Sequence, residues 1–409
     1  MTGVRARWIA LDARTWIENG AIVVRGGRVA SFHRNAAELA HVAIARTIDF
    51  GDALVAPGFV DAHAHLELSG LALATPASFA DWIRALIAAR GARAPDELGR
   101  DARAGADRLL ATGTTVVGDI DATGAGATSL ARHPLRRRVY REVLDGGDVA
   151  RTAAVLESLE RARTCRARDY SGIAPHAPYT LSPALFDALG RLARARHAWT
   201  SIHWAETREE TAWLARGEGP LAALLRESPR ASGLALIERA GLLGSRTLLV
   251  HGNEPEPGDL ARVARCRASL AHCPGTHAFF ARAPFDFDAA RGAGVRLVLG
   301  TDGRSSNADL DMRREMALVR RAAPELDPAD VLAMATSESA AALGFEGRAG
   351  VLHAGAWADF TVHSAAGVVT SDAWLEALTL AETAVSEVWI AGAPVHRASG
   401  EPSRAGPPA

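Results

Sequence analysis

The chain has 409 residues, which is long enough to bury a large hydrophobic core and allows two or three domains. Its net charge of −1 and pI near 6.9 provide neither the basic surface typical of nucleic-acid binding nor an acidic, solvated tract. No apolar run reaches the roughly 18 residues of a membrane helix, and no signal peptide is evident. With only three scattered cysteines, we expect a reduced, cytoplasmic protein.

The sequence contains no lysine, so all of its cationic side chains other than histidine are arginine. Schiff-base chemistry and phosphate binding by a P-loop both need the lysine amine, and both are therefore excluded. A carbamylated lysine that bridges two metal ions is excluded for the same reason.

Short strand patterns lie at both ends of the chain. Residues 21–25 and 28–32 flank Gly26-Gly27, a pattern typical of a β-hairpin, and similar segments return at 359–363 and 385–391. We therefore predict a small β-sandwich domain formed from both termini, residues 1–55 and 350–400. The tail 401–409 is rich in Pro and Gly and is expected to be disordered.

Strand and helix patterns alternate through the middle of the chain, residues 56–349. Segments such as 182–195 and 309–321 have the apolar spacing of helices and separate eight strand-like segments. Eight β-α units favour an α/β fold, a (β/α)8 TIM-type barrel. The rival, a doubly wound open sheet, lacks a G-x-G-x-x-G motif after its first strand. The predicted strands begin near Phe59 and continue at 114–118, 138–144, 171–175, 200–203, 247–251, 268–272 and 295–301.

The first predicted strand ends with His63 and His65, whose side chains leave the same face because they are two residues apart. Two neutral imidazoles side by side can bind zinc, iron or nickel, although the pair alone is also consistent with surface histidines. The strands of a barrel end at one face, so polar residues at the other strand ends would gather near this pair. Those residues are Asp119, Glu142, His176, His203, His251, His272 and Asp302.

Three of these segments suggest roles around a metal. Glu206 follows His203 by three residues, so it can lie beside the metal and move a proton between water and a substrate nitrogen; alternatively, it stabilises a helix N-terminus. Asp302 is a fourth ligand, a base toward the metal water, or both, or else a helix cap. His251 orients the hydroxide or polarises the attacked carbon, or is a core histidine.

Together the motifs resemble the amidohydrolase superfamily. The similar runs are residues 57–65, His203-x-x-Glu206, His251, 272–274, 300–302 and, in the C-terminal sheet, 350–360. Within that superfamily, residues 174–180, 305–307 and 310–312 resemble the S-adenosylhomocysteine/methylthioadenosine deaminase branch. Residues 65–69, 79–83 and 273–280 are more similar to aminodeoxyfutalosine deaminases.

This resemblance implies one divalent metal ion, zinc first and iron second, held by His63, His65, His203 and Asp302. It also implies Glu206 as proton shuttle, His251 beside the metal water and His176 toward the substrate.

Further substrate contacts are predicted at Glu67, Trp82 and Arg304. Glu67 can bond ribose hydroxyls or merely a backbone amide, and Trp82 can stack on a base or belong to the core or a lid. A benzoate-bearing substituent would need a cation, for which Arg84, Arg141 and Arg304 are candidates; Arg304 is nearest the metal motif in sequence. Phe279 and Phe280 are either an aryl wall or ordinary core.

We therefore predict a metal-dependent hydrolytic deaminase of a 6-aminopurine nucleoside derivative, with aminodeoxyfutalosine first and S-adenosylhomocysteine or methylthioadenosine next. Metal hydroxide attacks the amine-bearing ring carbon, while Glu206 protonates the ring nitrogen and then the departing ammonia. The alternatives are an amidase or chlorohydrolase with the same metal site, or an inactive barrel that serves as a binding protein. We expect a small-molecule nucleoside as the partner, and we expect no binding to nucleic acid or to a membrane. The sequence leaves open whether the protein forms a homodimer.

Overall fold

The computed structural model describes residues 1–161, 169–225 and 227–398, so the tail predicted at 401–409 lies outside the described residues. Its centre is an eight-stranded sheet in which the strands follow one another in sequence order, each parallel to the next. The strands are β8 (Phe59–Ala64), β9 (Thr114–Asp121), β10 (Arg136–Val143), β11 (Asp169–Pro175), β12 (Trp199–Trp204), β13 (Thr247–His251), β14 (Ser269–His272) and β15 (Arg296–Leu299).

The last strand returns to the first and closes the sheet. A parallel bridge joins Ala64 to Asp302, just after β15, and the Asp302 N–H donates to the His63 carbonyl at 2.9 Å. The approach is close at Gly300, where a Cβ atom would lie 2.8 Å from the His63 carbonyl oxygen, so only glycine fits. The predicted (β/α)8 barrel is confirmed, with all eight strands in their expected order.

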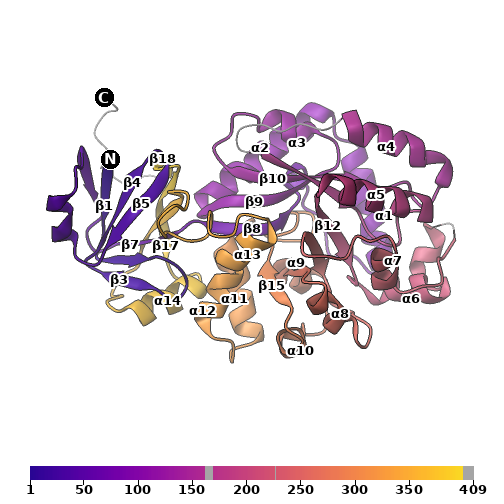
Figure 1. Cartoon of the computed structure of the whole chain (residues 1–409). Coiled ribbons are helices and arrows are strands. Elements are labelled where there is room, and N and C mark those ends of the chain that lie inside the picture. Colours follow the sequence, from indigo (N-terminus) through magenta and orange to yellow (C-terminus); the bar gives the residue numbers. More distant parts are fainter. Residues whose placement is uncertain (162–168, 226, 399–409) are drawn as a thin grey trace.

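Helices surround the barrel, and the sheets formed by the terminal segments lie at one end of the molecule, at the left of the view (Figure 1). Local sequence explains the boundaries of α5. Ser182 accepts a hydrogen bond from the Leu185 N–H, Pro183 occupies the first turn, and His197 ends the helix in the left-handed region. The helices are α1 (Phe79–Gly91), α2 (Pro95–Ala111), α3 (Ala125–Ser129), α4 (Thr152–Arg161), α5 (Pro183–Arg196), α6 (Arg208–Arg216), α7 (Gly233–Arg239), α8 (Asp259–Arg265), α9 (Pro274–Phe279), α10 (Phe287–Gly292), α11 (Met312–Ala322), α12 (Pro328–Met334), α13 (Ser337–Ala342) and α14 (Ser371–Thr379).

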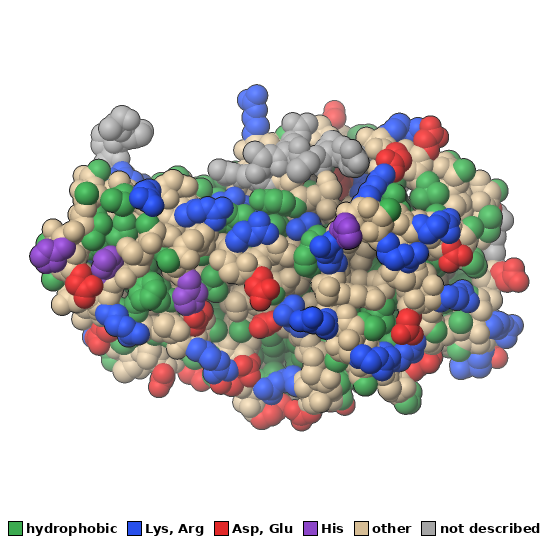
Figure 2. Space-filling model, in the orientation of Figure 1, with side chains coloured by type: hydrophobic (Ala, Val, Ile, Leu, Met, Phe, Trp, Pro, Cys, Tyr) green, Lys and Arg blue, Asp and Glu red, His purple; other side chains and the backbone are tan. Residues whose placement is uncertain are grey.

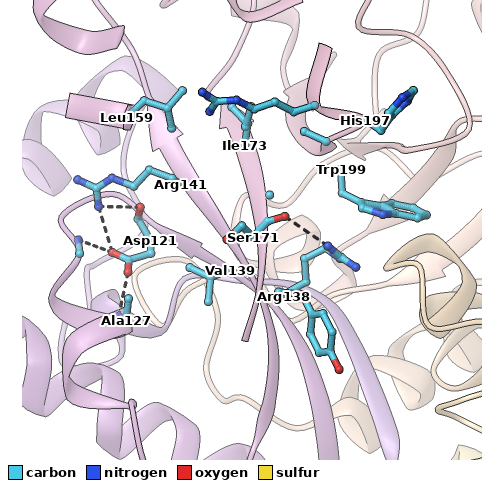
Figure 3. Close-up of a pocket in the computed structure, with 15 residues that line it drawn as sticks. Asp121, Ala127, Arg138, Val139, Arg141, Leu159, Ser171, Ile173, His197 and Trp199 are labelled. Carbon is cyan, nitrogen blue, oxygen red and sulfur yellow. Dashed lines mark hydrogen bonds and ion pairs between the residues drawn. The ribbon is translucent and has the colours of Figure 1, made fainter. Parts of the chain in front are cut away.

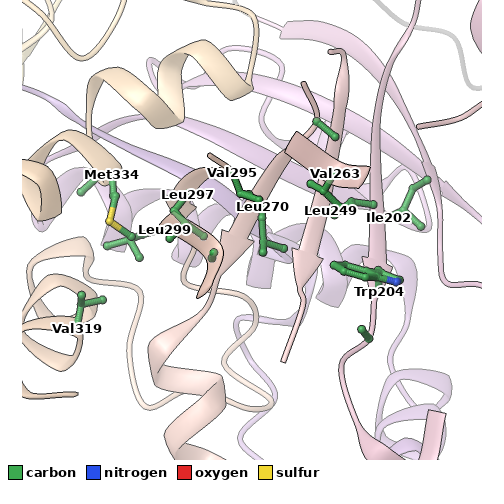
Figure 4. Packing of buried hydrophobic residues seen from close by; sticks show 14 of the residues in the cluster. Ile202, Trp204, Leu249, Val263, Leu270, Val295, Leu297, Leu299, Val319 and Met334 are labelled. Carbon is green, nitrogen blue, oxygen red and sulfur yellow. The ribbon is translucent and has the colours of Figure 1, made fainter. Parts of the chain in front are cut away.

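Apolar side chains of neighbouring strands form the layer that supports the strand ends (Figure 4). Ile202 of β12, Leu249 of β13 and Leu270 of β14 are completely buried in one cluster with Val263 of α8. Burying such a side chain contributes about 1.5–3 kcal/mol relative to leaving it exposed. This packing stabilises the strands that carry the polar residues at their ends.

The terminal segments form two sheets. Strands β5-β4-β1-β6 are all N-terminal, whereas the sheet β18-β17-β16-β7-β2-β3 combines both ends of the chain. The predicted hairpin is confirmed as β4 and β5, but only the second sheet is composite, through the pairing of β16 with β7. The division into two domains stays a prediction. The strands are β1 (Thr2–Arg5), β2 (Trp8–Ala10), β3 (Trp16–Glu18), β4 (Ala21–Arg25), β5 (Arg28–His33), β6 (Arg46–Asp49), β7 (Leu54–Pro57), β16 (Phe360–Ser364), β17 (Ala384–Ile390) and β18 (Ala393–Arg397).

Charged side chains of both signs are interspersed on the visible face of the molecule (Figure 2), in keeping with the balanced net charge. Among the described helices, none has the length and apolar composition needed to cross a bilayer.

Candidate metal and active site

Three histidines meet at the carboxyl ends of β8 and β12. The Nε2 atoms of His65 and His203 are 3.3 Å apart, and the ring of His63 lies 5.0 Å from each of theirs. His63 is completely buried, yet neither of its ring nitrogens has a hydrogen-bond partner. An unsatisfied buried polar group costs about 1–3 kcal/mol. The orphaned nitrogens of His63 therefore fit the role of a metal ligand.

Asp302 completes this group from the point where the barrel closes. Its Oδ1 lies 3.6 Å from His63 Nε2 and 3.5 Å from His65 Nε2, while its Oδ2 accepts a hydrogen bond from the Thr276 hydroxyl at 2.9 Å. Burial acts to raise the pKa of Asp302, but the neighbouring imidazoles of His63, His251 and His65 hold that pKa well below its usual range. The group thus offers an ionised carboxylate beside three imidazoles.

The histidines themselves are kept neutral. Burial lowers the pKa of His65 and of His203 well below the usual value, so their lone pairs are available at neutral pH. The Nδ1 of His203 donates to the His176 carbonyl at 2.8 Å, which leaves Nε2 to face His65. Such a bond to the far ring nitrogen commonly orients a metal-binding histidine.

The backbone turns sharply where the site residues enter the pocket. Ala205, His251 and Asp302 have φ values of 49°, 76° and 58°, in the left-handed region that non-glycine residues seldom occupy. Each such residue costs on the order of 1–3 kcal/mol, a cost that proteins commonly retain at functional sites.

Glu206 lies beside the histidine cluster, just after β12. Its Oε2 is 3.6 Å from His251 Nε2, and its backbone N–H donates to Glu210 at 2.8 Å. Asn253 donates to the Glu206 carbonyl at 3.1 Å. Burial raises the pKa of Glu206 to about 8. A carboxyl group with a pKa near neutrality can both take up and release a proton during a reaction.

Arg282 was not predicted from the sequence, yet it contacts this glutamate directly. Its Nη2 donates to Glu206 Oε1 at 3.0 Å. The guanidinium lies 4.6 Å from the ring centre of Phe280 and 5.8 Å from that of Phe79. Arg282 belongs to the loop after α9 rather than to a strand end, so the strand-end rule could not find it.

The residues predicted to contact the substrate make different contacts within the protein. His176 joins the cluster: its ring is 4.9 Å from the ring of His203, and burial lowers its pKa to about 4. Glu67 accepts bonds from the backbone N–H and hydroxyl of Thr123, at 3.2 and 2.7 Å. The Trp82 indole donates to the Ser305 carbonyl at 3.1 Å.

Arg304 is the remaining predicted substrate residue, and its Nε is buried without a hydrogen-bond partner. An unsatisfied guanidinium donor near the metal motif is compatible with a ligand anion. The substrate roles of His176, Glu67, Trp82 and Arg304 stay predictions.

Two strand-end residues do not join the cluster. Asp119 forms a buried ion pair with Arg137 at 3.2 Å, and His272 stacks on Phe285 with ring centres 4.3 Å apart. Within the described residues, the groups with ligand atoms close enough for a metal ion are His63, His65 and His203, and, sharing one member, Glu142, His176 and His203.

A cavity of about 760 Å³ lies along β10, β11 and the start of β12 (Figure 3). Arg141 pairs there with Asp121 at 3.4 Å, and Arg138 donates to the Ser171 carbonyl at 3.4 Å. The described residues that line this cavity include none of His63, His65 and His203.

The sequence model of the amidohydrolase family matches residues 54–395. A 5-methylthioadenosine/S-adenosylhomocysteine deaminase of Nitratidesulfovibrio vulgaris strain DP4 is 34% identical over 367 residues, which cover 85% of this chain and 79% of that protein. An aminodeoxyfutalosine deaminase of Deinococcus radiodurans is 33% identical over 301 residues, covering 68% and 70% of the two chains.

Solved structures are similar over nearly the whole chain. An adenosine deaminase from Xanthomonas campestris with bound zinc superimposes with a TM-score of 0.79 at 25% identity, covering 96% of this chain and 92% of that one. The aminofutalosine deaminase of Helicobacter pylori has a TM-score of 0.86 at 20% identity, covering 97% and 100%, which is a likeness of fold.

Proposed function

The chain belongs to the amidohydrolase family and is a hydrolytic deaminase, and we propose that it removes the 6-amino group of a purine nucleoside with a modified 5′ end. The observation that carries this proposal is the grouping of His63, His65, His203 and Asp302 around one point. Glu206 lies 3.6 Å from His251, whose ring is 5.5 Å from that of His203.

Those four residues would hold one divalent ion, zinc before iron. The unpartnered, buried nitrogens of His63 support the assignment, since a coordinate bond would satisfy one of them. Bound there, the ion supplies a nucleophile at neutral pH, because coordination lowers the pKa of water to about 7.

The protein side chains then handle the protons. Glu206 protonates the ring nitrogen next to the amine-bearing carbon and later delivers a proton to the departing ammonia. Arg282 holds one oxygen of its carboxylate, so the other oxygen, near His251, is the one that faces the reacting atoms. His251 and Asp302 orient the attacking oxygen, and His176 lies against the substrate.

The order of substrates is aminodeoxyfutalosine, then S-adenosylhomocysteine or methylthioadenosine. An aryl carboxylate needs flat apolar walls and a cation. The rings of Phe79, Trp82 and Phe280 pack together with centres 5.4–5.7 Å apart, and Arg282 lies over two of them. This aromatic group beside Glu206 favours Arg282, more than Arg84 or Arg141, as a companion to Arg304 in binding such a carboxylate.

Ammonia release from a panel of substrates tests the proposal. The panel contains aminodeoxyfutalosine, S-adenosylhomocysteine, methylthioadenosine, adenosine, guanine and cytosine, and the adenine nucleosides should react fastest, in the order given. Faster turnover of guanine or cytosine would contradict the substrate class. Hydrolysis of an amide or a ring chloride faster than any deamination would favour the amidase or chlorohydrolase alternative, and no turnover at all would favour a binding protein.

A further inference from the structure

Glu142 is a buried carboxylate that the reaction described above does not use. It is the last but one residue of β10 and, by strand alternation, shares a face with Tyr140, which packs among the buried residues of the neighbouring barrel strands. Its exposed fraction is 7%, and its Oε1 has no hydrogen-bond partner. A buried carboxylate oxygen without a hydrogen-bond partner costs free energy, unless a bound ligand donates a hydrogen bond to it.

Its neighbour is His176, which follows the adjacent strand β11. The His176 N–H donates to the Val143 carbonyl at 3.1 Å, so the two strand ends lie side by side. The ligand atoms of Glu142, His176 and His203 all lie within 4.8 Å of one another.

The His176 ring also offers an acceptor to this pocket. The Thr180 hydroxyl donates its single hydrogen to the Ala177 carbonyl at 3.0 Å. The contact of 2.9 Å between His176 Nδ1 and Thr180 Oγ1 must therefore use a hydrogen on Nδ1. In the neutral ring this leaves a lone pair on Nε2, next to the unsatisfied oxygen of Glu142.

A second metal ion does not account for the two adjacent acceptors, Glu142 and His176. The Nδ1 of His203 is bonded to the His176 carbonyl, and its Nε2 lies 3.3 Å from His65 Nε2, in the group assigned to the metal. One nitrogen can bind only one ion, so just two ligands, Glu142 and His176, remain for another. Two adjacent acceptors instead suit a ligand that brings two adjacent donors.

We propose that Glu142 and His176 are the acceptors for the two neighbouring hydroxyls of the substrate's sugar, which makes them the residues that select a ribonucleoside. This inference rests on the proposed function. The other candidate for the diol, Glu67, accepts two bonds from Thr123 at one of its oxygens, Oε2, whereas the unsatisfied Oε1 of Glu142 belongs to a carboxylate next to a second acceptor on the His176 ring.

Kinetics with deoxynucleosides test the assignment. We would measure kcat/KM for adenosine, 2′-deoxyadenosine and 3′-deoxyadenosine. The proteins compared are the wild type, Glu142→Ala, the shape-preserving Glu142→Gln, and Glu67→Gln, which alters the other candidate for the diol. In the wild type, loss of one hydroxyl should lower kcat/KM by about 10- to 100-fold, the range expected for a hydrogen bond to a charged group. In Glu142→Ala the penalty should fall below about threefold for one of the two deoxynucleosides, the one that lacks the hydroxyl bound by Glu142, because that hydroxyl no longer has its charged acceptor. Glu142→Gln should fall between these values, and metal content should be unchanged in both variants.

Each contrary result has its own meaning. Three results would overturn the diol assignment while leaving the proposed deaminase intact. They are a wild type that deaminates all three nucleosides equally, a penalty that persists for both deoxynucleosides in Glu142→Ala, and a penalty abolished only in Glu67→Gln. Loss of a second bound ion in Glu142→Ala would overturn it in favour of a metal site. A wild type that deaminates no adenine nucleoside would overturn the proposed function and this inference with it.

Discussion

The carboxylate of Glu206 lies beside the histidine cluster without belonging to it, and its expected role is proton transfer. Replacing it with Gln keeps the shape of the side chain but removes the proton-accepting oxygen pair. We expect Glu206→Gln to retain its metal and to lose about 10²- to 10⁴-fold in kcat, the usual contribution of a general acid-base group. Metal analysis and steady-state ammonia release, measured on the same preparation, separate the two effects.

His203→Ala provides the comparison, because it removes a ligand and should lose metal and activity together. If Glu206→Gln kept a rate close to that of the wild type, the shuttle would have to be another residue, and Asp302 would be the first to examine.

Arg282 should act through Glu206, as a residue that positions the carboxylate. Its bond to Oε1 is charge-assisted, and the flanking Phe280 ring keeps the guanidinium in place. Arg282→Met should lower kcat by about tenfold or more without changing metal content, because one hydrogen bond to a charged group is lost. Arg208 is a suitable control: it pairs with Glu254 at 3.2 Å and its side chain is 81% exposed, so Arg208→Met should leave kcat unchanged.

A KM that rises for carboxylate-bearing substrates in Arg282→Met would support its second proposed role, in binding the substrate carboxylate. An unchanged kcat would contradict the positioning of Glu206 by Arg282.

At the scale of single elements, Arg137 ties three neighbouring strands together beneath the site. From β10, its completely buried side chain pairs with Asp119 of β9 at 3.2 Å and with Asp169 of β11 at 2.8 Å. Removing one partner from a buried ionic group typically costs about 3–5 kcal/mol, since the remaining charges stay buried. We expect Arg137→Met to lower the free energy of unfolding in urea by that amount.

The exposed pair of Arg5 and Asp49, 3.8 Å apart, serves as the control, and Arg5→Met should change the free energy of unfolding by less than about 1 kcal/mol. Equal effects of the two substitutions would show that the Asp119–Arg137–Asp169 group does not stabilise the barrel.

Elements were largely predictable because each barrel strand is a short apolar run between helical patterns, and a local pattern needs no tertiary information. The same rule was less successful for individual side chains. It grouped Asp119 and His272 with the site residues, although Asp119 pairs with Arg137 and His272 stacks on Phe285. A strand end fixes the face of the barrel where a residue lies, but not the direction in which its side chain turns.

Over the whole molecule, the family and the barrel were predicted from the sequence and are confirmed, whereas the details of the site depend on how distant segments meet. Arg282 reaches Glu206 from a loop 76 residues further along the chain. The lack of a hydrogen-bond partner for Glu142 Oε1 can be recognised only when the positions of all neighbouring donors are known. Contacts of this kind have no periodicity in the sequence and so could not be inferred from it.

The metal content is the remaining prediction, and it concerns the whole chain. Two-metal sites of the kind bridged by a carbamylated lysine are unavailable here because the sequence contains no lysine. We therefore expect elemental analysis of protein purified without added metal to find about one divalent ion per chain. Chelation should abolish ammonia release and lower the melting temperature, because a ligand that binds only the folded state stabilises it by mass action. Adding zinc back to about one equivalent should restore both, and activity that keeps rising up to two tightly bound ions per chain would contradict the assignment of His63, His65, His203 and Asp302 to a single ion.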